Sequence, residues 1–307
     1  MNVIHSATEL KPAGRKVCAA IGFFDGVHLG HQQIIRQTIA DAQQHGAISV
    51  VITFDNHPTT IVAPERAPAL IHPLAQRLRT IESFGVHTLL LLHFDRDFSQ
   101  QPAEDFIASL ARDLGRIHSL CVGANFTFGH QRGGNVALLE RMGKSLGFAV
   151  HGLAAVALDG KTISSTRVRE AIRNGDLDAA GQMLGRAYSI SAAVEEGDRL
   201  GSRIGFPTAN LSVRGLVLPP NGVYAAQAII GGATHRCVLN IGVRPTLETR
   251  NPATRLEVHV LDFSGDLYGQ ELEVVFGEKL REEQKFGSLA QLQEQIARDV
   301  AAARLAG

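Results

Sequence analysis

The sequence lacks the features of disulfide-bonded and membrane-spanning proteins. Its only three cysteines, Cys18, Cys121 and Cys237, lie far apart and form no Cys-x-x-Cys pair, so neither a disulfide framework nor a structural zinc site is predicted. No run of about 18 apolar residues occurs, and residues 1–16 lack the apolar core of a signal peptide. We therefore expect a cytoplasmic protein that has no membrane partner.

An excess of charge of either sign is also missing. Lysine and arginine together number 30, as do aspartate and glutamate, which argues against a nucleic-acid partner bound through a basic face and leaves room only for a local basic pocket. The chain also has no internal repeat and no low-complexity linker. With 307 residues, of which 45% are apolar, it is long enough for two globular domains.

Residues 17–158 alternate between apolar runs typical of strands and amphipathic runs typical of helices. Strands separated by single helices cannot pair as hairpins, so they predict right-handed crossovers and a mostly parallel, Rossmann-like sheet covered on both faces. Ligands of such sheets bind beyond the carboxyl ends of the strands. The predicted strands are Val17–Phe24, Ile48–Phe54, Val86–Phe94, Ile117–Gly123 and Phe148–Leu158, and the predicted helices are His31–His45, Leu74–Phe84, Ala103–Leu114 and Val136–Leu146.

A predicted helix over Thr166–Leu184 separates this α/β pattern from a β-rich second half. Short apolar runs separated by Gly, Pro and Asn turns are typical there of an antiparallel barrel or sandwich. A final amphipathic run, Ser288–Leu305, predicts a terminal helix with Ser288 as its N-cap. We therefore expect one domain over residues 1–185 and another over residues 186–307. The predicted strands of the second are Tyr188–Glu195, Gly222–Ile230, His235–Ile241, Arg255–Phe263 and Glu271–Phe276.

Two phosphate-binding motifs follow predicted strands of the first half. Gly26–His31 reads Gly-Val-His-Leu-Gly-His and opens a helix, where unpaired N–H groups, glycines and imidazoles suit a phosphate. Ser164–Arg169 reads Ser-Ser-Thr-Arg-Val-Arg and opens another helix with hydroxyls and guanidiniums. Alone, the first motif would fit a polar turn, and a metal site there would need a third and a fourth ligand that do not lie nearby in sequence. Alone, the second motif would fit an ordinary N-cap. Together they predict a clamp for a triphosphate.

Two further strand ends combine an aromatic ring with polar side chains. They are Phe54–Pro58, which reads Phe-Asp-Asn-His-Pro, and Gly123–Gly129, which reads Gly-Ala-Asn-Phe-Thr-Phe-Gly. An aromatic face can stack on a flat heteroaromatic ligand while Asn125 binds its edge. Phe54 and Phe126 would equally suit the hydrophobic core, whereas Asn125 is harder to explain without a ligand.

The second half carries a glycine-rich segment and a strand glutamate. In Gly197–Asn210 the glycines permit close approach to phosphates, and Thr208 with Asn210 offers neutral oxygens for Mg²⁺. The segment is not a Walker A loop, because Lys-Ser/Thr is absent, and by itself it would fit a surface loop. Alternation along Arg255–Val260 places Glu257 and His259 on one face of a strand, where Glu257 would be either a general base or a solvated side chain.

These strings together closely resemble the prokaryotic bifunctional FAD synthetases, in which riboflavin kinase is fused to FMN adenylyltransferase. The resemblance covers nearly the whole chain. It rests on GFFDGVHLGHQ from Gly22, FDNHP from Phe54, GANFTFG from Gly123, SSTRVR from Ser164, GFPTANL from Gly205, NGVYA from Asn221, NIGVRPT from Asn240 and LEVHVLDFSGDLYG from Leu256.

The resemblance implies an N-terminal HxGH-type nucleotidyltransferase domain that transfers AMP from ATP to FMN, and a C-terminal β-barrel kinase that phosphorylates riboflavin. It implies riboflavin, FMN, FAD and ATP as ligands, Mg²⁺ as cofactor, and a monomer or weak homo-oligomer. His28, His31 and Asn125 would act in adenylyl transfer and Glu257 as the base of the kinase. The implied binding residues are Gly22, Phe24, His28, His31, Ser164, Ser165, Thr166 and Arg169 for the first ATP, Phe54, His57, Asn125 and Phe128 for the flavin, and Gly197, Gly201, Gly205, Thr208 and Asn210 for the second ATP, with Thr208 and Asn210 holding Mg²⁺.

The chain departs from the family pattern at a few positions. Phe23 stands where Asn is common, Asp55-Asn56 replaces Glu-Pro, and Asn125 stands where many members have Asp. Three other classes share part of the pattern: other HxGH nucleotidyltransferases, class I aminoacyl-tRNA synthetases, and non-catalytic flavin carriers. The GFPTAN and Glu257 segments argue against the first, and the absence of a KMSKS segment argues against the second. Formation of FMN and then FAD from riboflavin would exclude the third.

Overall fold

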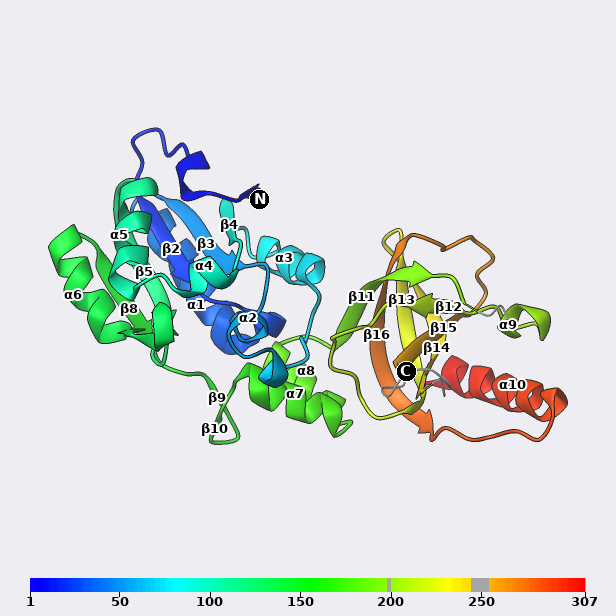
Figure 1. Cartoon of the computed structure of the whole chain (residues 1–307). Coiled ribbons are helices and arrows are strands. Elements are labelled where there is room, and N and C mark those ends of the chain that lie inside the picture. Colours follow the sequence, from blue (N-terminus) through cyan, green and yellow to red (C-terminus); the bar gives the residue numbers. More distant parts are fainter. Residues whose placement is uncertain (198–199, 244–253, 307) are drawn as a thin grey trace. The chain divides into compact units, whose positions relative to one another are not determined.

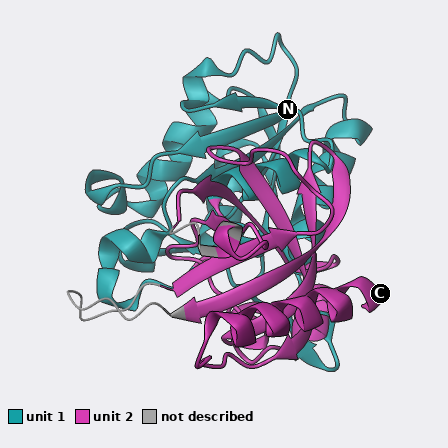
Figure 2. Ribbon diagram, turned by 90° about the vertical axis from the view of Figure 1, so that its right-hand side faces the viewer, with its two compact units in different colours: residues 1–69, 74–165 teal, residues 70–73, 166–307 magenta. Residues whose placement is uncertain are grey.

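The computed structural model describes residues 1–197, 200–243 and 254–306 (Figure 1). The chain forms two compact units, residues 1–69 with 74–165 and residues 70–73 with 166–307 (Figure 2). Asp198 and Arg199 of the glycine-rich segment and Arg244-Pro245-Thr246 of the NIGVRPT motif lie outside the described residues.

The first unit is built on a six-stranded, all-parallel sheet in the order β1-β4-β3-β2-β5-β8. This confirms the parallel sheet that the sequence predicts. The edge strand β1, which the sequence pattern did not reveal, pairs with β4. The strands are β1 (Asn2–Ile4), β2 (Val17–Ile21), β3 (Ile48–Phe54), β4 (Thr88–Leu92), β5 (Ile117–Gly123) and β8 (Ala149–Leu153).

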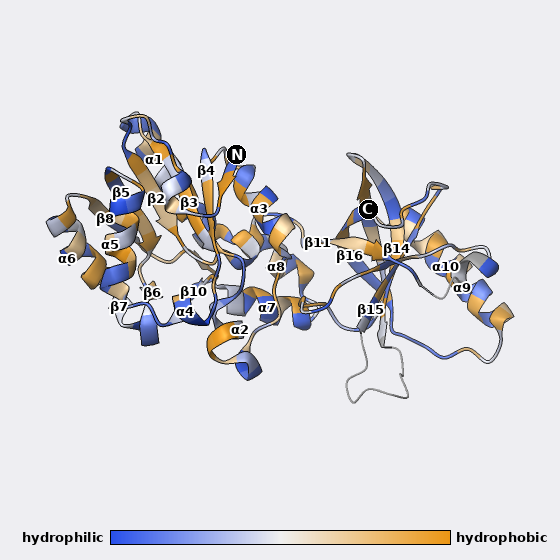
Figure 3. Ribbon diagram, turned by 45° about the horizontal axis from the view of Figure 1, so that its top comes forward, coloured by the Kyte–Doolittle hydropathy of each residue, from blue (hydrophilic) through white to orange (hydrophobic). Residues whose placement is uncertain are grey.

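Helices cover both faces of this sheet. Side chains from α5 (Ala103–Asp113) and α6 (Val136–Leu146) pack on one face, and side chains from α1 (Leu29–Gln44) and α3 (Leu74–Glu82) pack on the other. The strands β2 and β3 are therefore buried along their whole length. Figure 3 shows these central strands as hydrophobic and α5 and α6 as mixed in character.

The strand order reverses at β2, which has β3 on one side and β5 on the other. At such a point the connections leave β2 and β5 in opposite directions, so their carboxyl ends open a crevice. The remaining short elements of the unit lie mostly in connections that follow strands. They are η1 (Ala7–Glu9), η2 (Asp25–Val27), α2 (Pro58–Val62), η3 (Pro64–Arg66), α4 (Arg96–Ser99), β6 (Thr127–Phe128), η4 (His130–Arg132) and β7 (Gly134–Asn135).

The second unit is a closed six-stranded antiparallel barrel in the order β11-β12-β15-β14-β13-β16. This decides between the barrel and the sandwich that the sequence allowed. The strands are β11 (Ser189–Glu195), β12 (Ala209–Leu211), β13 (Gly222–Ile230), β14 (Ala233–Val243), β15 (Thr254–Val260) and β16 (Glu271–Arg281). A short helix, α9 (Leu200–Arg203), precedes β12, and the terminal helix α10 (Leu289–Leu305) begins after Ser288, whose side chain accepts a hydrogen bond from the backbone N–H of Gln291 as predicted.

Two predicted elements are interrupted in the structure. The predicted helix over Thr166–Leu184 is two helices, α7 (Ser165–Arg173) and α8 (Leu177–Leu184), because Gly175 adopts a φ of +77° and Asp176 caps a new helix. The predicted strand over Phe148–Leu158 ends at Leu153, after which β9 (Ala157–Leu158) and β10 (Lys161–Thr162) form a separate hairpin.

The second unit also includes a short segment from the first half of the sequence. Residues 70–73 belong to it, and Leu70 forms two backbone hydrogen bonds with the chain around Leu216: its N–H donates to Gly215 and its carbonyl accepts from Val217. The sequence pattern gave no sign of this segment, since it forms no periodic element of its own.

Candidate active sites

The turn after β2 brings two histidine rings to the start of α1. His28 is the N-cap of the helix, and its Nδ1 accepts a hydrogen bond of 3.3 Å from the backbone N–H of His31. The two rings stack with their centroids 3.6 Å apart. Because Nδ1 of His28 accepts, its ring proton lies on Nε2. Two imidazoles thus flank a helix N-terminus, where an anion is stabilised.

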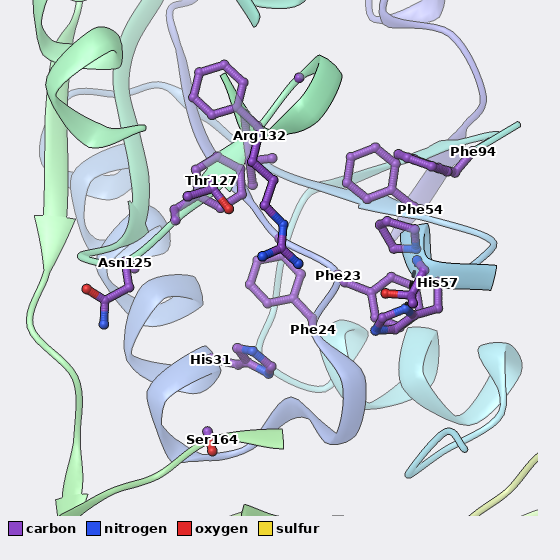
Figure 4. A pocket seen from close by; sticks show the side chains of 18 of the residues that line it. Phe23, Phe24, His31, Phe54, His57, Phe94, Asn125, Thr127, Arg132 and Ser164 are labelled. Atoms are coloured by element: carbon purple, nitrogen blue, oxygen red, sulfur yellow. Dashed lines mark hydrogen bonds between the residues drawn. The ribbon is translucent and has the colours of Figure 1, made fainter. Parts of the chain in front are cut away.

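The Ser164–Arg169 motif begins beside this turn. Ser164 lines the same cavity as His31 (Figure 4), and Ser165 Oγ donates a 3.0 Å hydrogen bond to the carbonyl of Asp25 within the turn. Thr166 and Arg169 lie further along α7, in the second unit, where Arg169 is buried. The structure therefore brings the two serines to the histidine turn. That Thr166 and Arg169 also bind the triphosphate stays a prediction.

A cavity of about 1180 Å³ opens at the carboxyl edge of the parallel sheet. It is walled by the ends of β2, β3, β5 and β8 and by the loops that follow them. The structure brings together in its wall the residues predicted from four separate motifs. They are Gly22, Phe24, His28, His31, Phe54, His57, Asn125, Phe128 and Ser164.

One part of this wall is a chain of phenylalanine rings. Phe54 lies 5.6 Å from Phe94 and 5.7 Å from Phe98, measured between ring centroids. The series continues through Phe106 to Phe128, which stacks on Phe126 at 5.4 Å. Sequence reasoning missed Phe94, Phe98 and Phe106, although Phe-Asp-Arg-Asp-Phe at the end of β4 was a signal of the same kind as the others.

Asp55, one of the departures from the family pattern, ties the ends of β3 and β4 together. Its Oδ1 accepts a 3.0 Å hydrogen bond from the backbone N–H of Phe94, and its Oδ2 accepts one of 2.5 Å from the ring of His93. Partial burial raises the pKa of Asp55, but these hydrogen bonds outweigh it and hold the pKa below its ordinary value. The carboxylate thereby fixes the loop that carries the Phe94 ring.

Arg77 of α3 lies behind the cavity wall. Its guanidinium donates to the carbonyl of Phe23 at 2.9 Å and to that of Phe54 at 2.5 Å. It also lies 4.1 Å from the centroid of the Phe23 ring, whose edge meets His57 with centroids 4.6 Å apart. One buried side chain thus holds the ends of β2 and β3 in place. The sequence did not reveal it, because a basic residue on an amphipathic helix normally faces solvent.

The cavity wall carries several side chains that can be cationic. Within the described part of the chain, no Asp or Glu lines it. Its potential therefore favours ligands that carry phosphate groups. The side chains that supply positive charge, some of them only when protonated, are His28, His31, His57, Arg96, His130 and Arg132, of which the last three were not predicted from the sequence.

In the second unit, Asn210, Glu257 and Asn240 form a row across three neighbouring strands. Asn210 of β12 pairs with Glu257 of β15, which pairs with Asn240 of β14. Leu256 and Val258 are buried while Glu257 is half-buried, as the alternation predicted. An Arg255 Nη1 lies 3.8 Å from Glu257 Oε1. The predicted kinase base and the predicted Mg²⁺ ligand are therefore cross-strand neighbours.

The glycine-rich segment folds against this row. A Cβ on Gly197 would overlap the Asn210 amide, and one on Gly201 would overlap the carbonyl of Phe206 and lie 3.3 Å from Thr208 Oγ1. Gly205 turns the chain with a φ of +87°. The predicted residues of the second ATP site thus lie together, within the part of the segment that the structure describes.

A smaller pocket of about 150 Å³ adjoins Thr208. Its wall combines aliphatic residues of β15 with the rings of Phe263 and Tyr268. Among the described residues, no group of three or more His, Cys, Asp and Glu side chains is placed to hold a metal ion. A cation bound near Thr208 and Asn210 would thus rely on neutral protein oxygens and on oxygens of its ligand.

Comparisons with known proteins agree across the whole chain. The FAD synthetase family model matches residues 10–167, and the riboflavin kinase family model matches residues 184–306. The chain is similar to the bifunctional riboflavin kinase/FMN adenylyltransferases of Pseudomonas fluorescens (40% identical, covering 99% of this chain and 97% of that one) and of Escherichia coli K12 (38%, 99% and 97%). The enzyme of that name from Bacillus subtilis is 33% identical, covering 97% of this chain and 95% of its own.

A crystal structure described as a macrolide-efflux protein from Streptococcus pneumoniae has a similar fold. It covers 98% of both chains with a TM-score of 0.83 and 29% identity. The efflux activity named in that description refers to the Streptococcus pneumoniae protein only. In the described part of the present chain, no helix has the length and apolar character needed to cross a membrane.

Two matched families, full-length relatives and two separate sets of site residues lead to one conclusion. The chain belongs to the family of bifunctional riboflavin kinase/FMN adenylyltransferases, which phosphorylate riboflavin to FMN with ATP and then transfer AMP from ATP to FMN to form FAD.

Proposed function

We propose that the cavity of the first unit is the adenylyltransferase site and that the row around Glu257 in the second unit is the kinase site. The observation that carries this proposal is the composition of the cavity wall, which joins the histidine turn to a chain of aromatic rings and contains no acidic side chain within the described residues. A volume of about 1180 Å³ exceeds the range of about 300–1,000 Å³ that is typical of sites for one small molecule, which suits a nucleotide and a flavin bound together.

In adenylyl transfer, an oxygen of the FMN phosphate attacks the α-phosphorus of ATP, and the bond to pyrophosphate breaks. His28 and His31 donate hydrogen bonds to the charge that develops on the α-phosphate and on the leaving group. Gly22 and Phe24 line the nucleotide side of the site, and Ser164, Ser165, Thr166 and Arg169 hold the triphosphate. Phe54, His57 and Phe128 take the flavin ring, and Asn125 lies between the two substrates. No protein nucleophile is needed.

In the kinase reaction, Glu257 takes the proton of the ribityl 5′-hydroxyl as its oxygen attacks the γ-phosphorus, and ADP leaves. Gly197, Gly201 and Gly205 let the backbone approach the phosphates. Thr208 and Asn210 fit Mg²⁺, because two neutral oxygens suit a hard cation that keeps water and phosphate ligands and neutralises phosphate charge when bound. The pocket beside Thr208 takes the adenine between Phe263 and Tyr268.

Both proposed sites are built within a single chain, which supports a monomer or weak homo-oligomer. We place the enzyme in the cytoplasm, where ATP is abundant.

Burial raises the pKa of the Cys121 and Cys237 thiols to about 12, so both stay protonated and unreactive.

Separate removal of the two activities tests the assignment. We expect the double variant His28→Ala/His31→Ala to form FMN but not FAD, and Glu257→Gln to form FAD from added FMN but no FMN from riboflavin. The matched control is His45→Ala/His118→Ala, which removes another histidine pair of the first unit, with ring centroids 3.9 Å apart, that does not line the cavity. If either test variant lost both reactions while still folded, the two-site assignment would be wrong.

A further inference from the structure

Arg132 extends from the hairpin of β6 and β7 into the cavity of the first unit (Figure 4). Its guanidinium points toward the ring of Phe24, with His31 beyond it. The residue belongs to no motif identified in the sequence, and the roles proposed above do not use it. Its position inside the cavity nevertheless requires an explanation.

The loop that carries Arg132 is held tightly against the rest of the unit. Gly129 and Gly134 flank it, and a Cβ on either would lie 2.6 or 2.7 Å from atoms of Ala103. The backbone N–H of His130 donates to the carbonyl of Gln101 at 2.9 Å. Such anchoring fixes where the tip of the loop can point.

The tip itself adopts an unfavourable backbone conformation. Gln131 and Arg132 have φ values of +50° and +59°, the left-handed region that residues with a Cβ rarely occupy. Two such residues in succession cost of order 1–3 kcal/mol each, and strain of this kind collects at ligand-binding segments. This tip carries the guanidinium that points into the cavity.

The guanidinium of Arg132 has no acidic partner among the described residues. No hydrogen bond or ion pair of this group occurs within residues 1–197, 200–243 and 254–306, and the cavity wall there contains no carboxylate. Arg77 of the same unit differs, since its guanidinium donates to two backbone carbonyls. Five N–H donors in a fixed fork, facing a cavity whose described lining has no acidic side chain, match a phosphate group.

Under the proposed function, the triphosphate of ATP and the phosphate of FMN meet in this cavity, and the position of Arg132 indicates which of them it binds. The histidine turn and Ser164 serve the triphosphate under the proposed function. Arg132 instead lies four residues after Phe128, in the loop that continues from the stacked rings of Phe126 and Phe128. A flavin that stacks on these rings must direct its phosphate toward the α-phosphate at the histidine turn in order to react, and this is the direction in which the Arg132 guanidinium points.

We infer that Arg132 binds the 5′-phosphate of the flavin and so selects the phosphorylated flavin, a phosphomonoester dianion, over riboflavin in the adenylyltransferase site. The inference rests on the proposed assignment of that site. Such selection has a consequence for the bifunctional chain: riboflavin, the substrate of the kinase, binds the adenylyltransferase site more weakly than FMN does and so competes little with it.

The test uses Arg132→Gln and Arg132→Lys in the full chain with Glu257→Gln added, so that riboflavin is not consumed. FAD formation is measured against FMN and against ATP, with riboflavin as a competitive inhibitor. We expect Arg132→Gln to raise KM for FMN about 10- to 100-fold, the loss typical of charge-assisted hydrogen bonds, and Arg132→Lys to raise it less. KM for ATP and the inhibition constant of riboflavin should change by less than about twofold. The control Arg141→Gln removes an exposed arginine of α6 that does not line the cavity, and it should change none of these values.

Each other outcome overturns the inference in a recognisable way. A rise in KM for ATP with an unchanged KM for FMN would assign Arg132 to the triphosphate. An equal weakening of FMN and riboflavin would mean that the loop only shapes the ring pocket, and no change at all would mean that the guanidinium binds nothing. Failure of the proposed site would show differently, as FAD formation that survives the double histidine variant, or as FMN formation that survives Glu257→Gln.

Discussion

Replacement of Arg77 by methionine tests whether this side chain supports the wall of the cavity in the first unit. Methionine keeps most of the apolar volume and removes both hydrogen bonds to the carbonyls of Phe23 and Phe54, together with the contact to the Phe23 ring. The Phe23 carbonyl keeps a hydrogen bond of 3.0 Å from Thr53 Oγ1. The end of β3 therefore loses more support than the end of β2.

The effect of Arg77→Met on the free energy of unfolding is the difference between the contacts that are lost and the cost of burying a charge that is removed. Two hydrogen bonds from a charged donor contribute about 3–6 kcal/mol and a buried cation–π contact about 1–2 kcal/mol. Burial lowers the pKa of Arg77 to about 10 from 12.5, so the charged form costs about 3 kcal/mol relative to water, and methionine removes that cost. We expect Arg77→Met to lower the free energy of unfolding by about 3 kcal/mol, and Arg77→Lys by about half as much.

Thermal unfolding and steady-state kinetics measure the result. For a unit of this size, a loss of about 3 kcal/mol lowers Tm by about 6–12 °C. Displacement of Phe23 and Phe54 should raise KM for FMN more than KM for ATP and leave the kinase activity unchanged. The control is Arg79→Met, an exposed arginine on the same helix. An Arg77→Met protein that matches the wild type in both Tm and KM for FMN would show that Arg77 does not support the two strand ends.

Three further changes should have distinct signatures. Burial lowers the pKa of His72 to about 3 from 6.5, so between these two pH values only the unfolded chain takes up a proton at this residue. The free energy of unfolding should therefore fall by up to about 1.4 kcal/mol per pH unit as the pH is lowered from 6.5 toward 3. Denaturant titrations of the His72→Gln variant should lack this pH dependence. Gly201→Ala places a Cβ against the Phe206 carbonyl and should reduce riboflavin phosphorylation, measured in a coupled assay, while FAD formation from added FMN persists. Equal loss of both activities would contradict this prediction. Ser288→Ala removes the N-cap of α10 and should cost about 1 kcal/mol of barrel stability in urea, whereas an unchanged midpoint would show that the cap contributes nothing.

The sequence predicted the long elements well because their periods are repeated many times. Helix α6 has the predicted bounds, Val136–Leu146, and the parallel sheet follows from strands alternating with helices. The failures lie where the pattern is short or interrupted. Three-residue strands such as β12 have too few residues to show a period, and the amphipathic pattern of Thr166–Leu184 continued across Gly175, where the backbone did not.

The candidate sites divide in the same way. Motifs local in sequence, such as the histidine turn and Ser164-Ser165, are visible because a helix start imposes a fixed residue order. Arg77 and Arg132 were not visible, because nothing beside them in sequence indicates that one lies under two strand ends and the other faces the cavity.

The sequence by itself determined the βα alternation, the β-rich second half and the local motifs, since each depends on neighbours a few residues away. The tertiary structure alone decided which side chains meet: the closure of the barrel and the register set Glu257 beside both Asn210 and Asn240, and packing of α3 set Arg77 behind Phe23. Register and packing depend on hydrogen bonds and contacts between residues distant in sequence, which no local pattern encodes.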